Sequence, residues 1–385
     1  MIHQSLNKLE QYIRKENFKG YDPYDTLNTW IPFHWFGKWI PVLAIQFQKR
    51  NPVNIRLLLG IKKDINPKAY GLFLQAYSML YARTGEKEHL EQARYFFDWL
   101  KENYSKGYCG KGWGYNFPWA SSEKYLKIRI PSAVVTGFVA RGLYAFYEIT
   151  KEKEVFELLK EAANFVLTEL PVTSFDEGVC FSYTPLASDL CYNASLLAAE
   201  TLARVHALEA DEQLKDMATQ AVNWVVSRQK EDGRWNYSVD LKTGKEREQI
   251  DFHQGYVLES IFEIGQLLGL DDRRWNEAIR KGLAFYREKQ FFPDGQSVWR
   301  YPKVYPVDIH NQSQGIITFS KLSEFGEAYG TFAKTIAEWT IKNMQGKDGH
   351  FYYRFGKYHK NKIPYMRWSQ AWMFLALTTL QSKGD

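Results

Sequence analysis

The chain has little cysteine and no long run of apolar residues. Its 385 residues include three cysteines, Cys109, Cys180 and Cys191, an odd number without the spacing of a metal site. This argues against a secreted fold held by disulfides and predicts reduced thiols. No uninterrupted apolar run reaches the roughly 18 residues of a membrane span, since Arg141 interrupts the best candidate.

The first 17 residues also lack the apolar stretch of a secretory signal. They form a polar, amphipathic pattern that carries Lys8, Glu10, Arg14 and Lys15. We therefore predict a soluble, cytoplasmic protein without an integral membrane segment.

Long blocks of one charge are absent. Fifty basic and 44 acidic residues give a net charge of +6 with no basic tract or arm, which argues against nucleic-acid binding and fits weak attraction of anionic ligands. No glycine-rich loop with a following Lys and Ser or Thr is present to cradle phosphates. No serine lies in a nucleophile-elbow pattern, and no His-x(2,3)-His spacing indicates zinc. We expect neither a metal nor another cofactor.

Aromatic residues, by contrast, are abundant. They make up 16% of the chain, within a hydrophobic share of 45% that is ample for a packed core. Part of this share serves core packing in any fold. Such a surplus of amphipathic rings also suits a cavity that stacks on sugars or holds an isoprenoid.

Apolar helical runs recur at a spacing of about 60 residues, which is the most informative property of the sequence. They begin near Tyr70, Ser132, Tyr192, Phe252, Ile309 and Met366. Each run is apolar around its whole circumference, which is typical of a helix buried between other elements. More highly charged amphipathic helices are predicted between them, near residues 88–103, 154–167, 212–228, 274–289 and 330–343.

With an N-terminal helix over residues 1–16, these segments make six inner and six outer helices. We predict an all-α fold of one domain, residues 1–385, arranged as an (α/α)6 toroid whose ring is closed by the N-terminal helix. Residues 17–65 are rich in Pro and aromatics and are expected at the mouth of the ring. Helical patches within residues 37–60 allow a seventh, partial hairpin.

The loops after three outer helices share a pattern of Gln, then Gly, then an aromatic residue. It is present at Gln229, Gly233 and Trp235, and again after Gln290 and Gln345. The glycine supplies a positive-φ turn that stops a helix. The pattern resembles the Gln-Trp repeats of the squalene cyclase and prenyltransferase superfamily, which are structural braces of α-toroids.

Polar residues mark the starts of the inner helices, most clearly in two Asp-x-His sequences, Asp251 to His253 and Asp308 to His310. In a toroid the inner helices run parallel, so their N-terminal ends and the positive ends of their dipoles converge on one face. The aspartates, including Asp189, suit either helix caps or catalysis. Histidine is not a favoured cap, so the repeated histidines indicate function.

The candidate residues fall into two groups. The predicted catalytic group comprises His253, His310, Asp251, Asp308, Asp189 and Tyr192. The predicted substrate-binding group comprises Arg129, Arg367, Trp368, Asn193, Asn311, Gln254, Tyr115, Trp35 and His34.

These residue types suit two kinds of sugar chemistry. Hydrolysis needs two carboxylates roughly 5–9.5 Å apart, which neighbouring helices can supply. Epimerisation or β-elimination of a uronate needs a base such as His253, His310 or Tyr192, with Arg129 or Arg367 neutralising the carboxylate. The sequence leaves epimerase, lyase and hydrolase open.

The repeats and helix starts resemble those of six-hairpin toroid enzymes: unsaturated glucuronyl hydrolases, N-acylglucosamine epimerases and the toroid domain of glucuronyl C5-epimerases. More narrowly, residues 21–28, 51–60 and 66–68 look like a family encoded in bacterial and archaeal polysaccharide-biosynthesis loci. The resemblance implies an enzyme that makes or modifies surface polysaccharide, with a saccharide or a lipid- or nucleotide-linked sugar as substrate. It supplies no catalytic residue.

Two other functions remain open at this point. A saccharide-binding or assembly protein would use the same polar mouth without turnover. An isoprenoid cyclase-like enzyme would suit the braces and the aromatics, but the Asp-x-Asp-Asp acid expected of a cyclase is absent.

Overall fold

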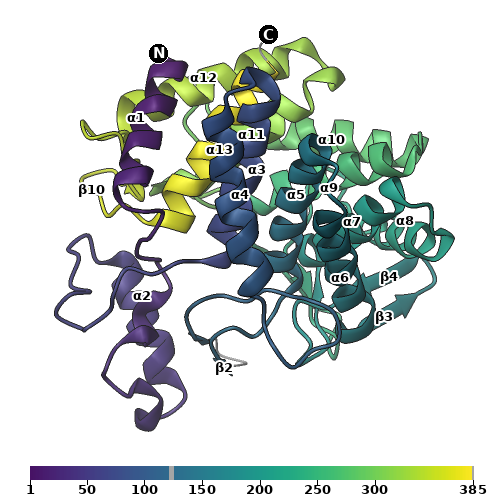
Figure 1. Cartoon of the computed structure of the whole chain (residues 1–385), viewed down its shortest axis with the longest axis horizontal. Helices are drawn as coiled ribbons and strands as arrows, with labels where there is room; N and C mark the ends of the chain where they lie inside the picture. The colour runs from purple at the N-terminus through teal and green to yellow at the C-terminus, as the bar shows by residue number, and fades with distance from the viewer. Residues whose placement is uncertain (121–124, 384–385) are drawn as a thin grey trace.

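The computed structural model describes residues 1–120 and 125–383, and Figure 1 shows its helices packed together above connecting loops and α2. The predicted (α/α)6 toroid is confirmed. The inner helices are α3 (Pro67–Thr84), α5 (Ala133–Thr150), α7 (Tyr192–Leu208), α9 (His253–Leu268), α11 (Ile309–Lys321) and α13 (Trp372–Ser382). The outer helices are α1 (Ile2–Lys15), α4 (Lys87–Glu102), α6 (Lys153–Glu169), α8 (Glu212–Ser227), α10 (Arg273–Gln290) and α12 (Glu327–Met344).

The ring closes because each inner helix packs against the next and α13 packs against α3. The N-terminal helix α1 packs on α13 and α12. Two glycines permit the closest approach, between α3 and α5. A Cβ atom on Gly71 would lie 2.8 Å from the carbonyl oxygen of Phe138, and one on Gly142 would lie 2.5 Å from the carbonyl of Gly71.

The predicted helix starts fall within one turn of the observed ones. The last inner helix differs in detail, because Met366–Ala371 forms a π-helical turn that leads into α13. Such turns occur preferentially at functional sites, and this one carries Arg367 and Trp368.

A network of buried charges joins four inner helices. Arg141 on α5 donates to both carboxylate oxygens of Glu200 on α7, at 2.7 and 2.6 Å, and lies 3.3 Å from Glu259 on α9. Arg204 also donates to Glu200, and Thr318 on α11 donates to Glu259. Burial would raise the pKa of Glu200, but the two arginines hold that pKa below its ordinary value. Glu200 is therefore a carboxylate.

A glutamine at the start of each of the last three inner helices braces the loop that precedes it. The Gln312 side chain is fully buried; it accepts from the Ser297 amide at 2.7 Å and donates to the Gly295 carbonyl at 3.1 Å. Gln254 makes the equivalent pair with Trp235 and Gly233, and Gln370 pairs with both backbone groups of Phe351. Gln254, predicted to bind substrate, makes these brace bonds and is not among the described residues that line the cavity.

Short antiparallel strands connect the loops on the face where the inner helices begin. β5 (Leu190–Cys191), β6 (Ser238–Val239) and β7 (Glu246–Arg247) form one sheet, and β8 (Val307–Asp308), β9 (Arg354–Phe355) and β10 (Lys360–Asn361) form another. The two-stranded pairs are β1 (Trp119–Ala120) with β2 (Tyr125–Leu126), and β3 (Val172–Phe175) with β4 (Gly178–Phe181). In the second sheet Asp308 lies opposite Arg354, which places a cation beside a predicted site residue.

Residues 29–60 form an extension that projects from the ring (Figure 1). It contains the helix α2 (Trp39–Arg50) and the 3-10 turn Phe33–Phe36; a further 3-10 turn, Asp25–Asn28, precedes it, and Ser323–Phe325 links α11 to α12. The helical patches therefore make one helix outside the ring and not a seventh hairpin. Among the described residues, no helix is long and apolar enough to cross a membrane.

The braces lead to a prediction about stability. We expect Gln312→Leu to lower the free energy of unfolding by about 2–4 kcal/mol, because the Ser297 amide and the Gly295 carbonyl would be left buried without partners. Denaturant unfolding measures the change. As a control, Gln213→Leu on the exposed face of α8 should stay within about 0.5 kcal/mol of the wild type. Equal stability of both variants would contradict the role of the brace.

Candidate functional site

A cavity of about 680 Å³ opens where the inner helices begin. This is the size of a small-molecule site. Described residues from the starts of all six inner helices line it, among them Lys68, Ser132, Asn193, His253, His310 and Arg367. The strand-forming loops and one side of α2 complete its wall.

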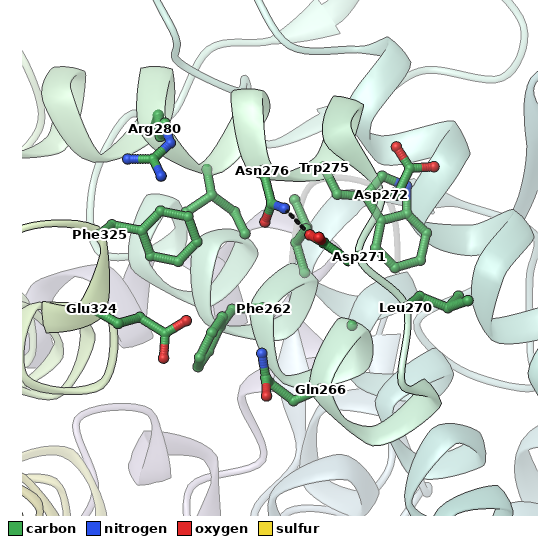
Figure 2. A pocket seen from close by; sticks show the side chains of 13 residues that line it. Phe262, Gln266, Leu270, Asp271, Asp272, Trp275, Asn276, Arg280, Glu324 and Phe325 are labelled. Carbon is green, nitrogen blue, oxygen red and sulfur yellow. Dashed lines mark hydrogen bonds between the residues drawn. The ribbon is translucent and has the colours of Figure 1, made fainter.

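A smaller cavity of about 250 Å³ lies near the other end of α9, against the start of α10. Figure 2 shows its polar groups, where Asn276 donates to Asp271 at 2.6 Å, beside the rings of Phe262 and Phe325. Among the described residues that line it there is no histidine. We therefore assign the chemistry to the larger cavity.

His253 and Asp251 form a hydrogen-bonded pair in the larger cavity. His253 Nδ1 lies 2.5 Å from Asp251 Oδ1, and the buried carboxylate also accepts the His253 amide and the Gln249 side chain. A carboxylate at Nδ1 favours the tautomer that carries its proton there. No described residue bonds His253 Nε2, so in this tautomer that nitrogen keeps an unshared lone pair, and His253 is among the residues that line the cavity. The pair is suited to general-base catalysis.

His310 lies close to this pair but is buried more deeply. Its ring stacks on Phe252 at 4.1 Å, and the His253 ring lies 4.2 Å from the same phenyl group, so the two histidines converge as their sequence repeat predicts. His310 Nε2 is 2.5 Å from the Tyr256 hydroxyl. Burial, reinforced by Lys68, Arg367 and His253, holds the pKa of His310 well below its ordinary value, so its imidazole is neutral at pH 7.

Asp308 caps α11 and holds the side chains of Trp368 and Arg354. One of its carboxylate oxygens accepts the His310 amide at 3.1 Å and the Trp368 indole at 2.8 Å, and the other accepts Arg354 Nε at 2.8 Å. Both oxygens are thus engaged. Asp189 accepts the Tyr183 amide at 2.8 Å and lines the cavity, but it does not cap α7.

Positive charge exceeds negative charge around the cavity. The described lining residues include eight lysines and arginines and three aspartates. Arg367 forms a two-pronged ion pair with the buried Asp22, at 2.6 and 2.8 Å. Lys49 donates to Tyr24 at 2.6 Å, and burial together with Arg354 lowers its pKa to about 7.

Lys68 is the buried lysine of this group. It is 3% exposed, and its ammonium nitrogen lies 4.1 Å from the ring centre of Phe138 and 5.2 Å from that of Trp372. Its side chain makes no hydrogen bond or ion pair with any residue that the structure describes. Burial, then Arg367 and Arg141, lower the pKa of Lys68 well below its ordinary value. A bound anion would offset this cost.

Most of the predicted site residues line the cavity. Those that do are His253, His310, Asp251, Asp308, Asp189, Arg367, Trp368, Asn193, Asn311 and Tyr115. Besides Gln254, four do not. Tyr192 donates to Glu246 and packs on Trp224, away from the cavity.

The other three lie at the surface. Arg129 is exposed in a left-handed backbone conformation with φ 62°. Trp35 is 76% exposed, and His34 is exposed beside it on the extension. None of the three is among the described residues that line the cavity.

Sequence reasoning missed Lys68, Tyr256 and Arg354. A signal existed for Lys68, because a cation in the first turn opposes the helix dipole and is unusual in an otherwise apolar helix. Arg354 reaches Asp308 only through strand pairing, which the sequence does not display. No group of three or more metal-binding side chains is found among the described residues.

No family model matches the chain, and no curated protein matches its sequence. Solved structures do match its architecture. The Lin0763 protein from Listeria innocua aligns with a TM-score of 0.66 at 13% identity, covering 99% of this chain and 97% of that one. Cellobiose 2-epimerase from Bacillus thermoamylovorans B4167 aligns with a TM-score of 0.64 at 15% identity, covering 83% and 88%.

An unsaturated glucuronyl hydrolase specific for heparin aligns with a TM-score of 0.60 at 14% identity, covering 83% of this chain and 87% of that one. At these identities the similarity shows the fold. The chain shares the toroid architecture of sugar epimerases and glycoside hydrolases.

Lys68 provides a prediction that links site and stability. We expect Lys68→Met to raise the free energy of unfolding at pH 7 by about 1–3 kcal/mol, since a neutral side chain of similar length replaces a buried amine without a carboxylate partner. Because the pKa of Lys68 is lowered in the folded state, its amine binds a proton more tightly in the unfolded chain, and this difference destabilises the folded wild type below the ordinary lysine pKa. The gain should therefore shrink as pH rises toward about 10.4, the ordinary lysine pKa.

Thermal or denaturant unfolding at pH 7 and pH 10 measures this gain. Lys87→Met is the matched control, because Lys87 lies in the first turn of α4 but is exposed. Because both lysines lie in the first turn of a helix, any difference between the two variants in the free energy of unfolding reports the burial of Lys68 and not its interaction with the helix dipole. A Lys68→Met variant less stable than wild type at pH 7 would refute the account.

The neutral His310 predicts a pH dependence. Its pKa is lowered in the folded state, so below about pH 6.5 the unfolded chain takes up a proton that the folded chain does not. Stability should fall as pH decreases from 7 to 5, with a contribution of up to about 1.4 kcal/mol per pH unit from this residue. His310→Phe should flatten the slope, and His359→Phe, at an exposed site, should leave it unchanged.

Proposed function

We propose that this chain is a carbohydrate-active enzyme that removes the proton from the carbon next to the carboxylate of a uronate-type saccharide. The observation that carries the proposal is the Asp251–His253 pair, whose Nε2 is unbonded among the described residues in a cationic cavity. The fold is one that sugar epimerases and a glucuronyl hydrolase also use. The sequence motifs further support a role in polysaccharide biosynthesis or modification, on a free, lipid-linked or nucleotide-linked saccharide.

The proposed class of substrate follows from the basic residues and the tryptophan rings that line the cavity. Arg367 and Arg354 supply positive charge and each already holds a carboxylate of the protein, whereas Lys68 has no carboxylate partner among the described residues and would gain its proton on binding one. Trp368 and Trp299 also line the cavity and offer faces for sugar rings. An acidic sugar satisfies both features.

The chemistry needs both a base and a cation. Removing a proton next to a carboxylate builds a second negative charge on that group, so a cation positioned there lowers the barrier. In the proposed reaction His253 Nε2 takes the proton, Asp251 stabilises the resulting imidazolium, and Lys68 with Arg367 binds the carboxylate. The Tyr256 hydroxyl, bonded to the neutral His310, is the neighbouring group that can supply a proton.

Two products share this first step. Returning a proton to the opposite face of the carbon inverts the centre, which is epimerisation. Loss of the oxygen substituent on the next carbon, with a proton from Tyr256, gives an unsaturated sugar, which is β-elimination. The rings of His253 and Tyr256 lie 5.8 Å apart, so this pair suits elimination from one face of the sugar, whereas epimerisation would take its returning proton from a group on the opposite wall.

Hydrolysis and isoprenoid cyclisation receive less support. Hydrolysis requires a protonated carboxyl group and a second carboxylate, whereas Asp308 is tied to Arg354 and Trp368 and Asp251 is tied to His253. Cyclisation passes through carbocations, which a cavity lined by eight lysines and arginines would destabilise.

Proton exchange tests the proposal. The enzyme is incubated in deuterated water with uronate-containing oligosaccharides, and NMR and mass spectrometry follow deuterium at the carbon next to the carboxylate and the appearance of an unsaturated product. We expect His253→Gln to lower the rate by about 10²–10⁴-fold, the usual contribution of a positioned base, and Asp251→Asn to lower it less.

His359→Gln, at an exposed site away from the described cavity lining, is the matched control and should keep the wild-type rate. Deuterium at an inverted carbon, without elimination, indicates an epimerase, and an unsaturated product indicates a lyase. A full rate in His253→Gln would exclude this residue as the base. Saccharide binding without exchange or product in the wild type would contradict the enzyme and favour a binding protein.

A further inference from the structure

We propose that the extension of residues 29–60 docks on an anionic lipid bilayer and holds the mouth of the toroid at the membrane surface. Ten large apolar side chains of this extension are exposed. They are Trp30, Trp35, Phe36, Trp39, Ile40, Leu43, Phe47, Val53, Leu57 and Leu58.

The amount of exposed apolar surface is unusual. The three tryptophans and two phenylalanines are 56–76% exposed. At about 150–250 Å² for each aromatic side chain, these five alone present roughly 500–800 Å². Soluble proteins rarely leave a contiguous apolar patch of this size without a partner.

The extension is held in place by polar bonds on its inner side. Arg56 is buried; it donates to the Asp25 carboxylate at 2.7 Å and to the Asp22 carbonyl at 2.8 Å. Thr29 donates to the Leu59 carbonyl at 2.7 Å. These bonds hold the two ends of the extension together and anchor it to residues 22–25, while its apolar side chains stay exposed.

The faces of α2 connect the apolar surface to the cavity. Trp39, Leu43 and Phe47 form an exposed stripe at helical spacing. Val42, Gln46 and Lys49 form a second face that lines the cavity. At 12 residues the helix is roughly 18 Å long, too short to span the roughly 30 Å of a bilayer core. It is therefore suited to lying on the membrane surface.

Charge identifies the bilayer as the partner. From residue 26 to residue 63 the sequence contains no Asp or Glu, whereas Lys38, Arg50 and Lys62 are exposed. Tryptophan, phenylalanine and leucine combined with lysine and arginine are typical of segments that lie in the interface of anionic membranes. A second copy of the chain would instead set these cations against themselves across a two-fold axis.

The docking has a consequence for the substrate. Because one helix carries both the exposed stripe and part of the cavity wall, a saccharide attached to a membrane lipid would lie within reach of the cavity. This consequence rests on the proposed function, whereas docking itself does not.

Vesicle binding tests the docking. Full-length protein is sedimented with vesicles of phosphatidylcholine containing 30 mol% phosphatidylglycerol, and tryptophan quenching by brominated lipids is recorded in parallel. We expect the wild type to bind, binding to weaken on pure phosphatidylcholine, and quenching to show insertion of the indoles. Trp35→Ser/Trp39→Ser and Leu57→Ser/Leu58→Ser should each lower the partition coefficient at least tenfold, and Lys38→Glu/Lys62→Glu should lower it on the anionic vesicles.

Val172→Ser/Phe292→Ser is the control, because it removes exposed apolar side chains outside the extension and should not change the partition coefficient. Circular dichroism confirms that each variant is folded. Absence of binding to the anionic vesicles, or binding that the extension variants leave unchanged, would overturn the proposal. A dimer that dissociates in the serine variants, seen by light scattering without vesicles, would assign the surface to a second copy and also overturn it.

Discussion

Arg141 and the carboxylates around it are the interaction on which the rest of the structure depends. The guanidinium of Arg141 and both carboxyl groups, Glu200 and Glu259, are buried, and with Thr318 they connect α5, α7, α9 and α11. Removing charges from water costs several kcal/mol for each ion unless they are paired in good geometry. The bonds of Arg141 to Glu200 provide that geometry and fix how these helices meet.

The same charge network affects the pKa of Lys68 in the cavity wall. Lys68 and Arg141 are both buried basic residues, but Arg141 has carboxylate partners and Lys68 has none among the described residues, and Arg141 contributes to the lowered pKa of Lys68. The fold therefore holds one compensated charge in its core and, at the cavity, one amine whose protonation burial disfavours. An anionic ligand is the missing partner that this arrangement favours.

The sequence predicted the ring closely but the site only in part. Buried and amphipathic helices follow from periodicity, and their shared starts predicted that His253 and His310 would converge. The periodicity could not predict which of the polar residues at a helix start face the cavity and which face a loop. His253 and Gln254 are adjacent, but a helix turns by about 100° for each residue, so one lines the cavity and the other braces a loop.

Contacts between loops that are distant in the sequence could not be predicted from the sequence either. Arg354 reaches Asp308 through the β8–β9 register, and Asp22 reaches Arg367 across almost the whole chain. Residues 17–65 were predicted at the mouth, and one face of α2 within this segment lines the cavity. Its exposed apolar surface was not foreseen, because an aromatic-rich segment is ordinarily assigned to a core.

The tautomer of His253 is the most direct test of the central claim, because a base must keep its lone pair toward the substrate. Nitrogen-15 NMR of selectively labelled histidines, with His253→Gln to assign the signal, can identify the protonated nitrogen of neutral His253. The account predicts a proton on Nδ1, bonded to Asp251, and an unprotonated Nε2. A proton on Nε2 would contradict it, because the lone pair would then face the carboxylate and not the cavity.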